Sequence, residues 1–201
     1  MGPRRSTTAT RTATAFAVHT GWAVQVTVAD AGNGPAVADR QRVLLCPDDV
    51  VRFAFHAAAE CPSIDEARTL VKDTEKAVKR ACRAVAKALD PGAVVVVPEG
   101  PVKPLPPTLE GILGSHPNLH TAEGELYRNG LVDAVEARGI DVLRFDPKSI
   151  FSDAAHERGT TATGVEDTTR ALGKGLGAPW TKDHRVAAAA ALWALALGDA
   201  T

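Results

Sequence analysis

The most constraining stretch of this sequence is AVVVV at residues 93–97, which is followed directly by Pro-Glu-Gly at 98–100. Valine is favoured in strands, and a run that is apolar on both faces is typical of a central strand in a parallel sheet. The run therefore predicts an α/β domain. Open α/β sheets bind their ligands at the carboxyl ends of the strands, so Glu99 becomes the best candidate for a site residue.

Other segments complete the expected sheet. Residues 13–19 and 22–28 are rich in Ala, Val, Thr and Phe and are separated by Thr20-Gly21, which predicts a hairpin. Residues 42–46 and 140–145 predict two more strands. Helices are expected over 63–89, where SIDE at 63–66 forms a capping box, over 121–138, near 164–173 and from about Asp183 onward. Residues 48–60 fit a strand or a helix and weakly favour a helix.

The resulting order is β-β-β-α-β-α-β-α. Three strands in hairpin succession followed by alternating helices and strands predict a mixed five-stranded sheet with helices on both faces. The 201 residues, 45% of them hydrophobic, fit one domain with a substantial core. Residues 1–12 are expected to form a flexible basic tail.

Charge and cysteine content limit the function. The formal net charge of −1 argues against a strongly basic surface, although a local basic patch remains compatible with it. No run of about 18 apolar residues occurs, so we expect no membrane span. Cys46, Cys61 and Cys82 fit neither a disulfide framework nor a zinc knuckle, which favours a cytoplasmic protein.

Four motifs occur in an informative order: AVHTGWA at 17–23, VVVVPEG at 94–100, HTAEGELYRNGLVDAVEARG with IDVLRFDPKSIF at 120–151, and KDHRVAAAAALWAL at 182–195. In this order they resemble the RuvC family of Holliday-junction resolvases, within the ribonuclease H-like superfamily. The resemblance implies one ribonuclease H-like domain over 13–198. It also implies a homodimer.

The resemblance assigns a site. It implies that His19, Glu99 and Asp183 are catalytic and bind a divalent metal, Mg²⁺ or Mn²⁺, with His184 as a further ligand. Two departures stand out. The first-strand aspartate of the family corresponds to His19, and the carboxylate one turn into the last helix corresponds to Val186.

These departures matter chemically. Two-metal phosphodiester cleavage uses carboxylates to hold both cations, and a neutral imidazole offers one lone pair and cannot bridge them. His19 therefore predicts a single-metal nuclease, a changed metal preference, or no catalysis. Structural interpretations stay open: His19 as a hydrogen-bonded strand end, Asp183 as a helix N-cap, and His184 as a surface or cap residue. We place His116, His120 and His156 in polar loops with no special role.

Nucleic acid is the expected partner. Lys103, Arg128, Lys148 and Lys182 fall near the presumed sheet edge, where they could contact phosphates. The basic face at 72–87 is more often simply solvated, and Trp22 and Trp180 could stack on bases or be buried. The sequence thus favours a divergent RuvC-like metal-dependent endonuclease acting on branched or single-stranded DNA. The alternative is a catalytically degenerate module that binds nucleic acid or a protein partner.

Overall fold

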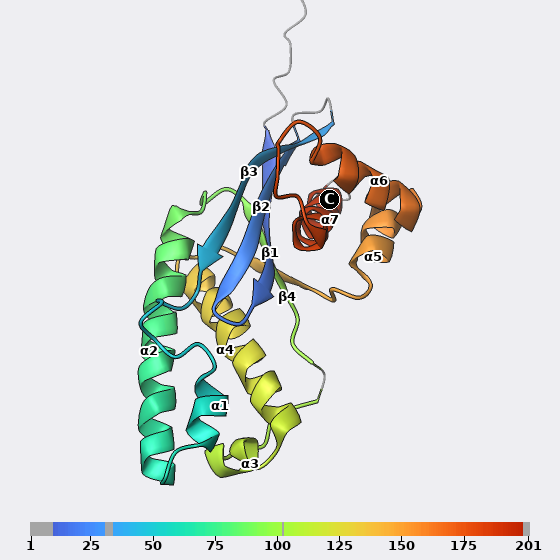
Figure 1. Cartoon of the computed structure of the whole chain (residues 1–201). Coiled ribbons are helices and arrows are strands. Elements are labelled where there is room, and N and C mark those ends of the chain that lie inside the picture. Colours follow the sequence, from blue (N-terminus) through green and yellow to red (C-terminus); the bar gives the residue numbers. More distant parts are fainter. Residues whose placement is uncertain (1–9, 31–33, 102, 199–201) are drawn as a thin grey trace, which may run out of the picture.

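The computed structural model describes residues 10–30, 34–101 and 103–198. Their centre is a five-stranded sheet in the order β3-β2-β1-β4-β5 (Figure 1). β1 (Arg11–His19), β2 (Trp22–Asp30) and β3 (Pro35–Leu44) pair in antiparallel fashion. β4 (Val94–Pro98) runs parallel to β1, and β5 (Val142–Phe145) runs parallel to β4. The predicted mixed five-stranded sheet is confirmed.

The turn between β1 and β2 places two aromatic rings side by side. Gly21 has a φ of +86°, a conformation that favours glycine, and it lets the chain reverse within two residues. His19 and Trp22 are therefore direct partners across the hairpin. Both belong to the end of the sheet where β1 and β4 finish.

Helices cover both faces of the sheet. α2 (Ile64–Ala88) and α4 (His116–Glu136) pack on one face, where a core forms around Phe16, Val95 and Leu131. α5 (Ile150–Glu157), α6 (Ala162–Leu172) and α7 (Lys182–Leu197) lie on the other face (Figure 1). Helices on both faces were expected.

α7 is the innermost helix of its layer. Five consecutive alanines, Ala187–Ala191, are fully buried, although a surface helix usually exposes one face. With methyl groups on all sides, the helix contacts β1 and β2 on one side and α5 and α6 on the other. Its axis can approach the sheet closely because no large side chain separates them.

A smaller cluster lies beyond the sheet. α1 (Ala54–Ala59) and α3 (Leu109–Leu113) pack against α2 and α4 around Phe55, Val71 and Leu119. Figure 1 shows both short helices near the ends of the two long ones, away from β1–β4. α1 confirms the helical preference of residues 48–60.

Several boundaries differ from those expected. α4 begins at His116 instead of residue 121, so His116 and His120 lie on a helix, and His156 lies in α5; the placement of these histidines in loops was wrong. The proline at 117 did not signal a loop, because proline is accepted in a first helical turn. β1 already begins at Arg11, within the range expected for the tail, and residues 1–9 lie outside the described part. All three cysteines are free, and no described helix is long and apolar enough to cross a membrane.

Candidate functional site

A cavity of about 350 Å³ opens where β1 and β4 end and α7 begins. It brings together His19, Glu99 and Asp183, which are separated by up to 164 positions in the chain. The other side chains around it are Ala17, Val18, Pro98, Arg128, Phe145, Pro147, Lys148, Lys182 and Val186. The fold therefore gathers the three residues expected to converge into one cavity.

His19 is held by a neighbouring ring and by a carboxylate. Its imidazole stacks on Trp22, with ring centroids 4.2 Å apart and planes inclined by 13°. Its Nε2 lies 3.1 Å from Oδ2 of Asp183, at ion-pair distance but without the alignment of a hydrogen bond. The guanidinium of Arg42 in turn lies 4.5 Å from the centre of the Trp22 ring. Through these contacts, His19 links the end of β1 to the start of α7.

Glu99 is positioned by the two parallel strands. Its backbone N–H donates to the carbonyl oxygen of Phe145 at 2.8 Å, which extends the pairing of β4 with β5 by one residue. Arg144 donates to the carbonyl oxygen of Pro98 at 3.0 Å. The Glu99 side chain itself is exposed, as suits a residue at the carboxyl edge of an open sheet.

Asp183 is not the N-cap of α7. The cap is Thr181, whose backbone N–H donates to Nδ1 of His184 at 3.2 Å and whose hydroxyl lies 2.9 Å from the same nitrogen. His184 therefore serves the cap, and it lines a neighbouring cavity with Trp22 and Arg40 instead of the one with Glu99. Capping by other residues leaves the Asp183 carboxylate available to the cavity.

The environment of His184 disfavours its charged form. Burial lowers the pKa of His184 below its ordinary value, and the nearby Arg40 lowers it further, while Asp183 acts in the opposite direction. A neutral imidazole with Nδ1 as acceptor is the form that the Thr181 N–H requires. The structure thus gives His184 a capping role and does not bring it together with His19 and Glu99.

Val186 occupies the wall where the resemblance places a second helix carboxylate. It lines the cavity with Glu99 and Asp183 and is 9% exposed. An isopropyl group has no donor atom for a cation. This side of the cavity is therefore apolar.

Three of the four expected phosphate-binding cations line the cavity: Arg128, Lys148 and Lys182. Lys103 is exposed and lies outside it. Lys148 and Lys182 are also exposed, so their ammonium groups are free to meet a ligand. The cavity thus holds three permanent cations against the two carboxylates Glu99 and Asp183.

Arg128 is the most restrained of the three. A methyl group added at Gly124 would lie 2.7 Å from its Nη1, and one added at Gly100 would lie 3.4 Å from its Nη2, so the guanidinium is pressed against two glycines. Its Nε is buried and has no hydrogen-bond partner among the described residues. Burial, with Arg144 acting in the same direction and Glu125 against it, lowers the pKa of Arg128 below its ordinary value. Arginine nevertheless stays charged at neutral pH.

The cavity does not fit a pair of divalent cations. Within the described part of the chain, the only group of His, Cys, Asp and Glu residues with ligand atoms all within 4.8 Å of one another is His56, His116 and His120. His19, Glu99 and Asp183 do not form such a group. The apolar Val186 and the three cations further oppose the binding of two dications, which need several carboxylates.

A second cavity of about 480 Å³ shares Asp183 with the first. Trp22, Arg40 and Arg42 contribute to its lining. Arg40 donates to the carbonyl oxygens of Leu176, Gly177 and Pro179 and so holds the loop that leads into α7. Its role in this structure is therefore to position the loop.

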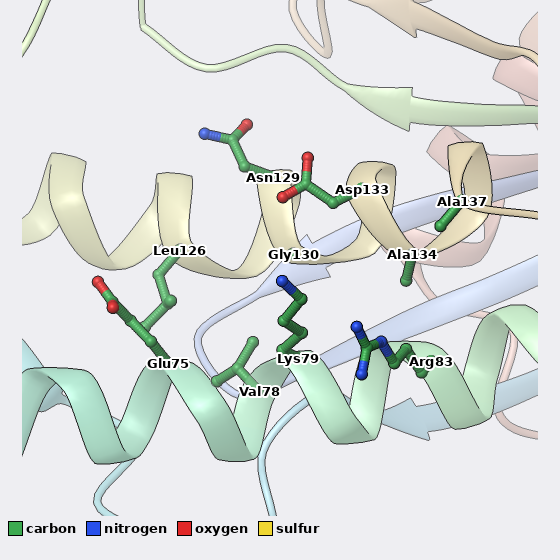
Figure 2. Close-up of a pocket in the computed structure, with 10 residues that line it drawn as sticks. All are labelled: Glu75, Val78, Lys79, Arg83, Leu126, Asn129, Gly130, Asp133, Ala134 and Ala137. Carbon is green, nitrogen blue, oxygen red and sulfur yellow. The ribbon is translucent and has the colours of Figure 1, made fainter.

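A further cavity, of about 500 Å³, is a groove between α2 and α4. Figure 2 shows Val78 and Lys79 of α2 pointing toward α4, and Gly130 lies where the helices approach. A methyl group added at Gly130 would lie 3.2 Å from Val78. Because this groove lies between two helices and away from the strand ends, we do not regard it as the site.

Sequence reasoning gave no role to Arg144, which donates to the carbonyl oxygen of Pro98, or to Arg42, which lies over the Trp22 ring. Strand alternation alone does not reveal which neighbours these two side chains contact. Trp180 donates to the carbonyl oxygen of Thr169 at 2.9 Å and packs against the core, so the structure favours the buried interpretation for it.

No protein-family model and no curated protein sequence matches this chain. Solved structures that are similar to it include two of RuvC. A structure of T. thermophilus RuvC in complex with Holliday junction substrate has a TM-score of 0.56 and 13% sequence identity, and the match covers 94% of this chain and 96% of that one. A Thermus thermophilus RuvC structure has a TM-score of 0.57 and 14% identity, with 96% of each chain covered. The sheet order, the helices on its two faces and these matches establish that the chain has a RuvC-like fold of the ribonuclease H-like class.

Proposed function

We propose that this protein is a RuvC-like module that binds branched DNA through its sugar-phosphate backbone, and that it does not cleave DNA by a two-metal mechanism. The observation that carries the proposal is the composition of the cavity at the ends of β1 and β4. Three cations surround it, and two of the positions that would carry metal-binding carboxylates are His19 and Val186. Phosphate is the ligand that such a set of groups favours.

Each cation has a distinct place in this function. Lys148 and Lys182 are exposed and act as point charges toward a phosphate, whereas Arg128 is fixed against Gly124 and Gly100. A restrained guanidinium loses little rotamer freedom on binding. Arg128 therefore orients the phosphate, and the two lysines add attraction.

The substrate class follows from what the cavity lacks and from the fold. We propose that recognition rests on the backbone and on DNA shape, which the cations of the cavity can contact without reading base edges. The similar Thermus protein was solved with a Holliday junction, which supports a branched substrate. A homodimer is part of the same proposal, since it would present two such cavities to the arms of one junction.

Binding is tested with a fluorescently labelled four-way junction and with duplex and single strands of the same sequences. Anisotropy is measured in EDTA, so that binding does not depend on metal. We expect the junction to bind most tightly and a K148A/K182A variant to lose about tenfold or more in affinity, since each lost phosphate contact weakens binding. K87A, a matched change at the far end of α2, should bind like the wild type. Equal affinity of the double variant and the wild type would refute the proposal.

A second candidate function is a nuclease that uses one metal ion. The presence of His19, Glu99 and Asp183 around one cavity favours it. One histidine and two carboxylates suit Mn²⁺ or a similar transition metal better than Mg²⁺, although their ligand atoms would first have to move together. Junction DNA is incubated with Mg²⁺ and with Mn²⁺, using the wild type and E99Q. Cleavage that E99Q abolishes would replace the binding proposal by this one.

A further inference from the structure

Three histidines meet where α1 contacts α4, apart from the cavity described above. His56 lies on α1, while His116 and His120 lie one turn apart on α4 and so share a face of that helix. Ligand nitrogens of the three rings all lie within 4.8 Å of one another. None of the three lines the cavity that holds His19 and Glu99.

The rings pack around a common point. Ring centroids are 4.6 Å apart for His56 and His120, 4.5 Å for His116 and His120, and 5.2 Å for His56 and His116. Two of the three pairs are nearly perpendicular, with planes inclined by 85° and 86°, so the rings are not in a parallel stack. In this arrangement one nitrogen of each ring lies within 4.8 Å of a nitrogen of each of the other two.

A buried carboxylate stands behind this cluster. Glu123, one turn beyond His120 on α4, is 1% exposed, and its Oε1 lies 2.9 Å from Nδ1 of His56. The backbone N–H of His56 donates to the same oxygen at 3.3 Å. Its second oxygen, Oε2, is buried without a hydrogen-bond partner among the described residues. A buried, incompletely paired carboxylate is costly, and a nearby cation would offset that cost.

The contact with Glu123 fixes the tautomer of His56. An ionised carboxylate only accepts hydrogen bonds, so a neutral His56 that donates to Glu123 from Nδ1 has its lone pair on Nε2. A histidine that donates from one nitrogen to a carboxylate and presents the other nitrogen to a metal is the usual arrangement around protein-bound zinc. In His56 the contact of Nδ1 with the carboxylate is already present, which leaves Nε2 as the nitrogen available to a metal.

The ligand nitrogens of the three histidines are close enough together for one metal ion to bind all of them after small movements. Nitrogens bound to a tetrahedral zinc ion at about 2.1 Å lie roughly 3.4 Å apart. His116 and His120 are exposed, so small rotations of their side chains can close the remaining gap without disturbing the core. Three imidazoles favour Zn²⁺, Ni²⁺ or Cu²⁺ over Mg²⁺ or Ca²⁺, which prefer oxygen.

We propose that His56, His116 and His120 bind one divalent transition-metal ion of the zinc class, supported by the buried Glu123 behind His56. The ion ties α1 to the first turns of α4. α1 has six residues and no side-chain hydrogen bond at its N-cap, and isolated helices of that length are unstable. A bond through His56 to α4 therefore holds α1 in place.

Binding is tested on the full chain, purified without a polyhistidine tag and stripped with EDTA. Zinc is titrated by calorimetry, and Co²⁺ is added as a spectroscopic probe because its visible absorption reports a tetrahedral site. We expect one equivalent of zinc to bind with a Kd below about 10 µM. H116A and H120A should each abolish this binding, and E123Q should weaken it by about 10- to 100-fold. H156A and H19A are the matched controls and should bind as the wild type does.

The outcomes separate this site from the other cavity. A Kd weaker than 10 µM for the wild type overturns the proposal, and so does binding that survives in both H116A and H120A. Loss of binding in H19A alone would assign the ion to the other cavity and overturn it as well. The stabilisation of α1 by the ion is measured by amide hydrogen exchange. Zinc should slow the exchange of residues 53–60 in the wild type and not in H120A. Unchanged exchange in zinc-bound wild type would overturn the structural role.

Discussion

The salt dependence of DNA binding gives the sharpest test of the proposed phosphate binding by the cavity. Each phosphate neutralised by a protein cation on duplex DNA contributes about −0.9 to the slope of log K against log salt concentration. Three cations line the cavity, Arg128, Lys148 and Lys182. Together they should contribute about −2.7 to the slope, and K182A should reduce that contribution to about −1.8.

These slopes convert into measurable affinities. Between 50 and 200 mM NaCl, a slope of about −2.7 weakens binding by roughly 40-fold, whereas about −1.8 weakens it by roughly 12-fold. Contacts outside the cavity would steepen both slopes equally, so the difference between the variants is the predicted quantity. Lys182 is exposed at the first turn of α7, and its truncation should leave the fold unchanged.

The assay is a series of anisotropy titrations of labelled junction at four or more salt concentrations. K87A serves as the control, since it removes the same charge from the C-terminal end of α2. The reasoning is refuted if K182A keeps the wild-type slope, or if K87A changes the slope as much as K182A does. In the first case the cavity does not contact phosphate; in the second, binding depends on overall charge alone.

Three further predictions concern single side chains. G124A should weaken junction binding several-fold, because its new methyl group would lie 2.7 Å from Nη1 of Arg128. Thermal unfolding of this variant should show no loss of stability, since alanine is favoured over glycine in helices by about 1 kcal/mol. Junction binding equal to that of the wild type would contradict the positioning of Arg128. L192A should lower the free energy of unfolding in urea by about 2–5 kcal/mol because Leu192 is fully buried, with the partly exposed Leu176 as the control position. The pKa of His184 is lowered in the folded chain, so the unfolded chain takes up this proton at a higher pH than the folded chain does. The stability that neutral His184 contributes is therefore complete above about pH 6.5, the ordinary pKa of histidine, and is lost as the pH falls below it. H184Q can keep the cap of α7 without titrating, and urea unfolding at pH 7.5 and 5.0 should show a smaller pH-dependent loss for H184Q than for the wild type.

Much of the sheet was predictable because the relevant signals are local. The apolar run at 93–97 predicted a central strand, and β4 lies between β1 and β5 with Val95, Val96 and Val97 fully buried. The RuvC resemblance implied that His19, Glu99 and Asp183 share one site, and all three line one cavity; from the residues alone, only Glu99 was a candidate, because it follows the end of a buried strand. The resemblance to RuvC is confirmed at the level of the fold. The roles of these residues in metal binding stay predictions.

The rest depended on contacts that sequence spacing does not carry. His116 and His120 have helical spacing, but the proline at 117 made the segment read as a loop, and nothing local indicated that His56 would face them. His184 has its capping role because it lies three residues after Thr181, the N-cap of α7. Both residues are visible in the sequence, but the sequence interpretation named Asp183 as the N-cap instead. α5 was also missed, because its eight residues follow a strand and a turn with little periodicity.

The five enclosed alanines of α7 make the site sensitive to changes far from it. A larger residue at any of Ala187–Ala191 has no free space to enter, so the helix or the groups packed on it have to shift. Lys182 and Asp183 belong to the first turn of that same rigid rod, so they would travel with it and draw away from His19. A conservative exchange among Ala187–Ala191 can therefore alter the proposed phosphate binding at the first turn of α7, although no residue that lines the cavity is changed.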